Sequence, residues 1–250
     1  MPSFTPHVCQ PRRHLLLAGA GLALSSAAVT ARTSGSGRVQ REPRSVPDFD
    51  AIAVSGAIDL QVRQGSTQAL ELSADDNILP LVETVVEPGR HGHTLHIRIK
   101  RGESVGSQTP IQATVDVVRL QALVSAGSGQ LRVAALKTPS LRLSVAGSGR
   151  AQLDALTTDA LDLRVAGSGE VRAAGTAGKV KLTIAGSGDV DLAPLAADEV
   201  VVSIAGSGDA RVTANKSLGV TIAGSGDVVY GGTATAVRTS VAGSGRATRR

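Results

Sequence analysis

The sequence is short of cysteine and of aromatic residues, and each shortage excludes a class of site. Its only cysteine is Cys9, so the chain can form no internal disulfide and no cysteine-ligated metal site. Tryptophan is absent, and the only aromatic residues are Phe4, Phe49 and Tyr230. Because single-stranded nucleic acids bind largely by stacking bases on aromatic side chains, no nucleic-acid partner is expected. The hydrophobic core must be built from valine, leucine, isoleucine and alanine.

Long amphipathic helices are also absent, and no run of like charges exceeds a few positions. The formal net charge of +5 comes from scattered basic residues, so it does not by itself indicate an acidic partner. The shortage of aromatics counts most against a sugar groove lined by stacking rings. It leaves a flat polar face open as a binding surface.

Residues 1–31 have the pattern of an export signal. The pair Arg12-Arg13 precedes an apolar run that ends at Val29 and is too short to span a bilayer. The pair fits a twin-arginine signal and general secretion equally well. Cleavage after Ala31 removes two arginines and no acidic residue, so the net charge falls from +5 to +3. We expect an exported mature chain without a transmembrane segment, located in the periplasm or at the cell surface.

The composition divides the remaining chain into three parts. Residues 32–46 are rich in serine, glycine, arginine and proline and lack apolar periodicity, which predicts a flexible linker. Residues 47–118 alternate apolar and polar positions and predict an N-terminal β cap with the first coils. Within this part, residues 84–100 predict a β-hairpin, and residues 75–82 predict a brief helical or irregular excursion. Residues 119–250 contain an internal repeat, so residues 47–250 are expected to form one domain.

The repeat is the tetrapeptide Ala-Gly-Ser-Gly, and it is the strongest signal in the sequence. Successive copies are spaced by 18 to 20 residues and begin at Ala126, Ala146, Ala166, Ala185, Ala205, Ala223 and Ala242. A period near twenty with short strands is typical of one coil of a parallel β-solenoid, in which each coil pairs only with its neighbours. The flanking residues follow the same pattern each time, so equivalent positions should stack in register.

Half of the glycines belong to these motifs, so the glycine excess is periodic. Strand alternation continued through the motif places both glycines on the inward face and the serine on the outward face. A side chain at either glycine would crowd the narrow interior at a bend. The predicted structural glycines are Gly127, Gly129, Gly147, Gly149, Gly167, Gly169, Gly186, Gly188, Gly206, Gly208, Gly224, Gly226, Gly243 and Gly245.

Several blocks together resemble the putative auto-transporter adhesin head GIN domain family. They are FDAIAVSGAIDL at residues 49–60, LELSADDN at residues 70–77, TLHI at residues 94–97, and the repeated VAGSG coils. The resemblance covers roughly residues 46–245. It implies an all-β, right-handed parallel β-helix-like solenoid in exported bacterial envelope proteins. It supplies no catalytic residues.

Two patterns suggest a metal site only weakly. The run at residues 185–192 resembles a calcium-binding nonapeptide, but Val190 stands where that motif needs aspartate, and the period is about twenty rather than nine. His91, His93 and His96 share one hairpin, but His96 has the opposite strand parity from His93. A solvated hairpin tip is therefore favoured over a metal site. No metal or other cofactor is expected.

The position after each motif forms a column when the coils stack. Three consecutive coils place Asp189, Asp209 and Asp227 in this column. Exposed carboxylates at ~5 Å repel each other by about 1 kcal/mol in water. The column could bind a cation or a basic partner, or it could be a solvated face neutralised by Arg172 and Arg211. We favour the solvated face.

The sequence thus predicts an exported, non-catalytic domain that acts as an adhesion or interaction module in the envelope, with an undefined partner. One alternative is an enzyme acting on envelope polysaccharide, which rests on analogy between β-helix folds alone. Another is a passive structural spacer. The last coil either carries charges that deter strand addition or forms the contact of a homo-oligomer.

Overall fold

The computed structural model describes residues 32–89, 92–107 and 109–250, and most of them lie in β-strands. The one helical element among them is a short 3₁₀ helix, η1 (Leu79–Leu81), inside the segment for which an excursion is predicted. None of the described helices is long and apolar enough to cross a membrane. The predicted export signal, residues 1–31, lies outside the described residues.

The strands fall into a cap and a set of repeats. The strands of the cap are β1 (Arg32–Ser34), β2 (Val39–Arg44), β3 (Ala51–Gly56), β4 (Ile58–Gln64), β5 (Ala69–Asp75), β6 (Val82–Gly89), β7 (Gly92–Ile99), β8 (Ser104–Gly106) and β9 (Ile111–Val117). Those of the repeats are β10 (Ala122–Gly127), β11 (Gln130–Val133), β12 (Leu136–Gly147), β13 (Arg150–Gly167), β14 (Glu170–Gly186), β15 (Asp189–Gly206), β16 (Ala210–Gly224), β17 (Asp227–Gly231), β18 (Ala236–Gly243) and β19 (Arg246–Arg249).

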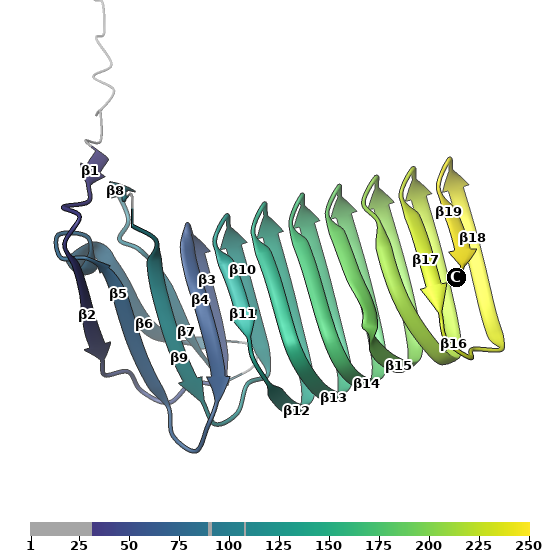
Figure 1. The fold of residues 1–250 in the computed structure, drawn as a ribbon, viewed down its shortest axis with the longest axis horizontal. Helices are drawn as coiled ribbons and strands as arrows, with labels where there is room; N and C mark the ends of the chain where they lie inside the picture. Colours follow the sequence, from purple (N-terminus) through teal and green to yellow (C-terminus); the bar gives the residue numbers. More distant parts are fainter. Residues whose placement is uncertain (1–31, 90–91, 108) are drawn as a thin grey trace, which may run out of the picture.

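The repeats form a parallel β-solenoid, which confirms the predicted architecture. Figure 1 shows the coils stacked in a row from β10 to β19. Strands of successive coils pair in parallel, and the motifs align: Gly147 lies beside Gly167, and Gly167 beside Gly186. Equivalent residues therefore stack along the solenoid axis at the ~4.8 Å spacing of paired strands.

A single coil has three sides, as β13 illustrates. Its residues alternate between inward and outward except at Asp154-Ala155 and Asp159-Ala160, where neither of two consecutive residues is buried. These two breaks and the Ala-Gly-Ser-Gly motif mark three corners. The side that directly follows the motif, such as Arg150 to Asp154, is called the first side below.

The core of the solenoid consists of aliphatic side chains stacked in ladders. One ladder, in which no member is more than 2% exposed, contains Leu143, Leu163, Leu182, Val202 and Val220. Complete burial of such a side chain contributes about 1.5–3 kcal/mol. The one aromatic residue of the repeats, Tyr230, lies beside Val212 in another ladder and is half-buried against the core.

The cap combines antiparallel and parallel pairs and continues into the first coil. β6 and β7 pair in antiparallel orientation, which confirms the predicted hairpin. β5 pairs in antiparallel orientation with both β2 and β9, whereas β4 and β9 are parallel. β3 and β4 then pair in parallel with β10 and β11. The cap therefore supplies the first template on which the repeated coils stack.

Residues 32–46 differ from the predicted flexible linker. β1 pairs with β8, and β2 pairs with β5. Between these strands, the Ser36 backbone N–H donates to Asn77 Oδ1 at 3.0 Å, and Asn77 Nδ2 donates to the Ser34 carbonyl at 2.8 Å. Arg38 also forms an ion pair with Asp76 at 2.8 Å. The composition of residues 32–46 did not predict these strands, because the residues that bind the segment lie far along the chain, in β5 and β8 and at Asp76 and Asn77.

The two glycines of each motif play different parts, which corrects the prediction that both face inward. The second glycine, such as Gly149, is buried in every motif but the last, where Gly245 is half-buried. The first glycine is exposed or half-buried and has a positive φ, which is 109° at Gly147. The turn at the first glycine interrupts the strand alternation. A Cβ on Gly147 would lie 2.6 Å from the carbonyl oxygen of Gly127, and one on Gly149 would lie 2.7 Å from that of Gly129. The backbone of the preceding coil therefore excludes side chains at both glycines, and at second glycines such as Gly188 and Gly208 a buried core side chain also stands in the way.

Candidate ligand-binding face

One outer surface of the molecule carries three hollows. It is formed by cap strands β2, β5, β9 and β4, by β11, and by the first sides of the later coils. We call it the polar face because its outward residues are mainly polar. One row across it, defined by the strand register, contains Thr114, Gln61, Arg132, Gln152 and Arg172.

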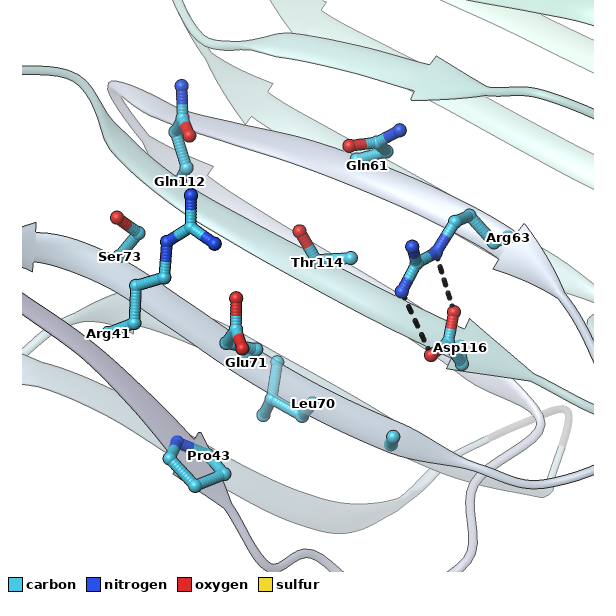
Figure 2. A pocket seen from close by; sticks show the side chains of 11 residues that line it. Arg41, Pro43, Gln61, Arg63, Leu70, Glu71, Ser73, Gln112, Thr114 and Asp116 are labelled. Carbon is cyan, nitrogen blue, oxygen red and sulfur yellow. Dashed lines mark hydrogen bonds and ion pairs between the residues drawn. The ribbon is translucent and has the colours of Figure 1, made fainter.

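One hollow of this face lies on the cap and has a volume of about 520 Å³, which is within the usual range for ligand sites. Figure 2 shows its side chains rising from four neighbouring strands. We call it the cap trough. It is lined by Arg41, Pro43, Gln61, Arg63, Ala69, Leu70, Glu71, Ser73, Gln112, Thr114 and Asp116.

Two charged residues of the cap trough are already bound to each other. Arg63 Nε donates to Asp116 Oδ1 at 2.8 Å, and Arg63 Nη2 donates to Asp116 Oδ2 at 3.0 Å. This bidentate arrangement fixes both side chains at one end of the trough, as Figure 2 shows. The pair therefore lines one end of the trough, and its charged groups are less available to a ligand than unpaired ones.

The remaining polar side chains of the cap trough keep their hydrogen-bonding capacity. These side chains form no hydrogen bond or ion pair with any other described residue. They belong to Arg41, Gln61, Glu71, Ser73, Gln112 and Thr114. Figure 2 shows the Arg41 guanidinium reaching over the sheet toward Gln112. The set comprises one cation, one anion, two amides and two hydroxyls. It can donate and accept hydrogen bonds without breaking any internal bond among the described residues.

A second hollow continues the cap trough toward the repeats. It has a volume of about 210 Å³ and shares Gln61, Gln112 and Thr114 with the cap trough. Its far side is formed by Gln130 and Arg132 of β11. The two hollows therefore adjoin each other across five strands, and together they are called the groove below.

A third hollow, the repeat trough, lies farther along the polar face and is acidic. It has a volume of about 280 Å³ and is lined by Glu170, Arg172, Asp189, Val190, Asp191, Asp209, Ala210, Arg211, Asp227 and Val229. Its five carboxylates exceed its two arginines, which gives a formal charge of −3. The pKa of Glu170 is lowered, mainly by a hydrogen bond from Arg150 at 2.8 Å and also by the charge of Arg172.

The predicted aspartate column lies in the repeat trough, where two of its members bond to the backbone. Asp209 Oδ1 accepts the N–H of Asp227 at 2.8 Å, and Asp227 Oδ1 accepts the N–H of Arg246 at 2.9 Å. For Asp189, no side-chain hydrogen bond to another described residue is found. Asp209 and Asp227 therefore form hydrogen bonds between successive coils, a role that the spacing of the residues did not indicate.

The two arginines expected to neutralise the column behave differently. Arg172 pairs at 2.9 Å with Glu170 on its own first side, so its charge is used one coil before Asp189. Arg211 forms no ion pair with any described residue. Because the trough has five carboxylates against two arginines, its formal charge stays negative even with both arginines present.

The described part of the chain contains no group of three or more histidine, cysteine, aspartate or glutamate residues that could hold a metal ion. His93 is exposed, whereas His96 is half-buried with its Nε2 at 3.8 Å from Glu87 Oε2 across the hairpin. His91 lies outside the described residues.

Comparisons with known proteins agree on one family and one fold. The family model described as "Putative auto-transporter adhesin, head GIN domain" matches residues 48–234. A crystal structure of a putative adhesin from Bacteroides fragilis has a TM-score of 0.80 at 23% identity and covers 87% of this chain and 99% of its own. At this identity the likeness concerns the fold alone. No curated protein matches the chain.

Two structures from Parabacteroides distasonis are also similar to this chain. One is a putative lipid binding protein, with a TM-score of 0.73, 26% identity, and coverage of 88% of this chain and 100% of its own. The other is a putative adhesin, with a TM-score of 0.69, 25% identity and the same coverage. The solenoid with its cap is therefore a shared architecture.

Proposed function

Because the chain belongs to the putative auto-transporter adhesin head GIN domain family, we propose that it is an exported, non-catalytic module that binds a partner in the cell envelope or at the cell surface. The observation that carries this proposal is the cap trough. Six of its side chains have hydrogen-bonding groups that no other described residue uses. Polar groups aligned on a rigid sheet, with their bonds available, suit recognition of a polar partner.

The charges of the cap trough support binding rather than hydrolysis. Glycosidases typically use two carboxyl groups, one on each side of the scissile bond. In the cap trough, Asp116 is held by Arg63, which leaves Glu71 as the only unpaired carboxylate. One of the similar structures is named a putative lipid binding protein. The polar lining of the trough favours a polar ligand instead.

Binding is tested with the purified full chain immobilised on beads and exposed to bacterial envelope fragments. We expect saturable retention of the fragments and their release by excess soluble chain. A spacer would retain nothing, and an enzyme would release soluble sugar fragments. Either result would contradict the proposal.

Export is tested by fractionating cells that produce the full chain with a tag at its carboxyl end. We expect a shortened product outside the cytoplasm, because the predicted signal ends at Ala31. Full-length protein confined to the cytoplasm would rule out this part of the proposal.

A further inference from the structure

We infer that the groove formed by the cap trough and the hollow beside it binds an uncharged, extended carbohydrate chain that lies across strands β2, β5, β9, β4 and β11. This inference rests on the proposed function and names the class of ligand. It follows from the charge balance, the available hydrogen-bonding groups and the length of the groove.

The charges of the polar face favour a neutral ligand. In the cap trough, Arg41 and Arg63 balance Glu71 and Asp116, so the formal charge is zero. Farther along the same face, the repeat trough has a formal charge of −3. A polyanion laid along the solenoid axis would meet this acidic surface, where like charges repel. A neutral chain meets no such penalty.

The unpaired side chains match the hydrogen bonding of sugar hydroxyl groups, which both donate and accept. Arg41 only donates, Glu71 only accepts, and the amides of Gln61 and Gln112 do both. These groups already face solvent, so a ligand would replace their bonds to water without disrupting the protein. No aromatic side chain lines the groove. The ligand must therefore be held by many hydrogen bonds rather than by stacking.

The dimensions of the groove favour several linked sugar units over a single one. Its five strands span about 19 Å at the usual ~4.8 Å strand spacing. Gln130 of β11 adds a further unpaired amide at the far end. Because each neutral hydrogen bond contributes only about 1 kcal/mol net, affinity should rise with the length of the oligosaccharide until the groove is filled.

The test is an array of neutral linear oligosaccharides of increasing length, printed beside polyuronate oligosaccharides and anionic phospholipid vesicles, and probed with the full chain. We expect binding to the longer neutral oligosaccharides. Dissociation constants of the best neutral binder then follow from calorimetric titration. Arg41→Ala should weaken binding about tenfold, because hydrogen bonds from a charged group contribute most. The double variant Gln61→Ala with Gln112→Ala should weaken it by at least as much.

The matched control is Arg211→Ala, which removes an unpaired arginine from the same face but from the repeat trough. It should leave the dissociation constant unchanged, and all variants should melt like the wild type because the altered side chains are exposed. Equal losses in the control and the trough variants would overturn the inference. So would binding confined to polyuronates or vesicles, or the absence of glycan binding. If beads still retain envelope fragments in that case, the proposed function stands and only the carbohydrate ligand is rejected.

Discussion

The cap and the repeats solve the same structural problem with different means. In the repeats, each strand pairs with the equivalent strand of the preceding coil. Glycine is required wherever the backbone of that coil comes close. In the cap, strands pair in both directions, and side chains such as Asn77 and Arg63 hold particular segments in place. Regular stacking leaves little room for variation at the corners. The cap strands do not repeat one another, so their outward polar residues can form a groove that occurs once in the molecule.

We expect this difference to separate the residues that stabilise the fold from those that bind the proposed ligand. A change at a repeat corner affects the pairing of two coils, whereas a change on the outer surface of the cap affects only groups that face solvent. The predictions below test the separation, beginning with the largest expected effect.

The largest effect is expected when a buried motif glycine gains a side chain. A Cβ at Gly208 would lie 2.3 Å from the carbonyl oxygen of Gly188 and 2.9 Å from Ile184 Cγ2. Gly208→Val should therefore destabilise the fold by about 3 kcal/mol, which corresponds to a fall of about 10 °C in Tm. Thermal unfolding followed by circular dichroism measures the change.

The matched control is Gly65→Val in the cap, where a Cβ would meet nothing within 4 Å. Its Tm should stay close to that of the wild type. If both variants unfold at the wild-type temperature, close contact between coils does not explain the recurring glycine.

A smaller effect is expected at the docked segment of residues 32–38. Asn77→Ala removes two hydrogen bonds, which together are worth about 2 kcal/mol. In one the Ser36 N–H donates to Asn77 Oδ1, and in the other Asn77 Nδ2 donates to the Ser34 carbonyl. We expect faster amide exchange confined to this segment, measured by hydrogen–deuterium exchange. Asn215→Ala, in the repeats, serves as the control and should leave the exchange unchanged. Equal exchange in the wild type and Asn77→Ala would mean that other contacts hold the segment.

The aspartate column allows a comparison within a single type of residue. Asp209→Ala removes the acceptor of the Asp227 N–H and should cost about 1 kcal/mol, whereas Asp209→Asn retains an acceptor oxygen and should cost less. Asp189→Ala removes a carboxylate that bonds to no other described residue, and it should leave the free energy of unfolding unchanged. The free energy of unfolding of the three variants is measured by chemical denaturation and compared with that of the wild type. Similar losses in Asp189→Ala and Asp209→Ala would point to the charge of the column rather than to the backbone bond.

The smallest effect concerns acidity. The pKa of Glu170 is lowered, mainly by the hydrogen bond from Arg150, so the folded chain binds this proton less readily than the unfolded chain. The stabilising contribution is present above the ordinary pKa of glutamate and disappears as the pH falls through the lowered value. In Glu170→Gln, Tm should depend slightly less on pH in this acidic range. An identical dependence in both proteins would show that the exposed pair contributes nothing measurable.

Local patterns sufficed for much of the fold. Alternation and a period near twenty predicted the parallel coils, and the β6–β7 hairpin followed from its apolar parity. The same alternation failed at Gly147, because the positive φ of this residue turns the chain and interrupts the parity. The flexible linker predicted from composition for residues 32–46 is not found, because that segment is ordered by Asn77 and by β5 and β8.

The candidate site was harder to predict than the fold. Asp189, Asp209 and Asp227 were visible as a column because the repeat fixes their register. The cap trough was missed because it joins residues between Arg41 and Asp116 through a strand order that no repeat imposes. Each of its side chains alone is an ordinary outward polar residue. Only their adjacency distinguishes them.

The sequence by itself determined the stacked coils, their aliphatic core and the recurring glycines, because each of these depends on a pattern that repeats at a fixed short distance. The tertiary structure alone decided which strands of the cap lie together, and hence where unpaired polar groups gather. It also showed that the backbone of the preceding coil excludes a side chain at each motif glycine. The physical reason is the same in both cases: these contacts join atoms that are distant along the chain, and local periodicity contains no information about them.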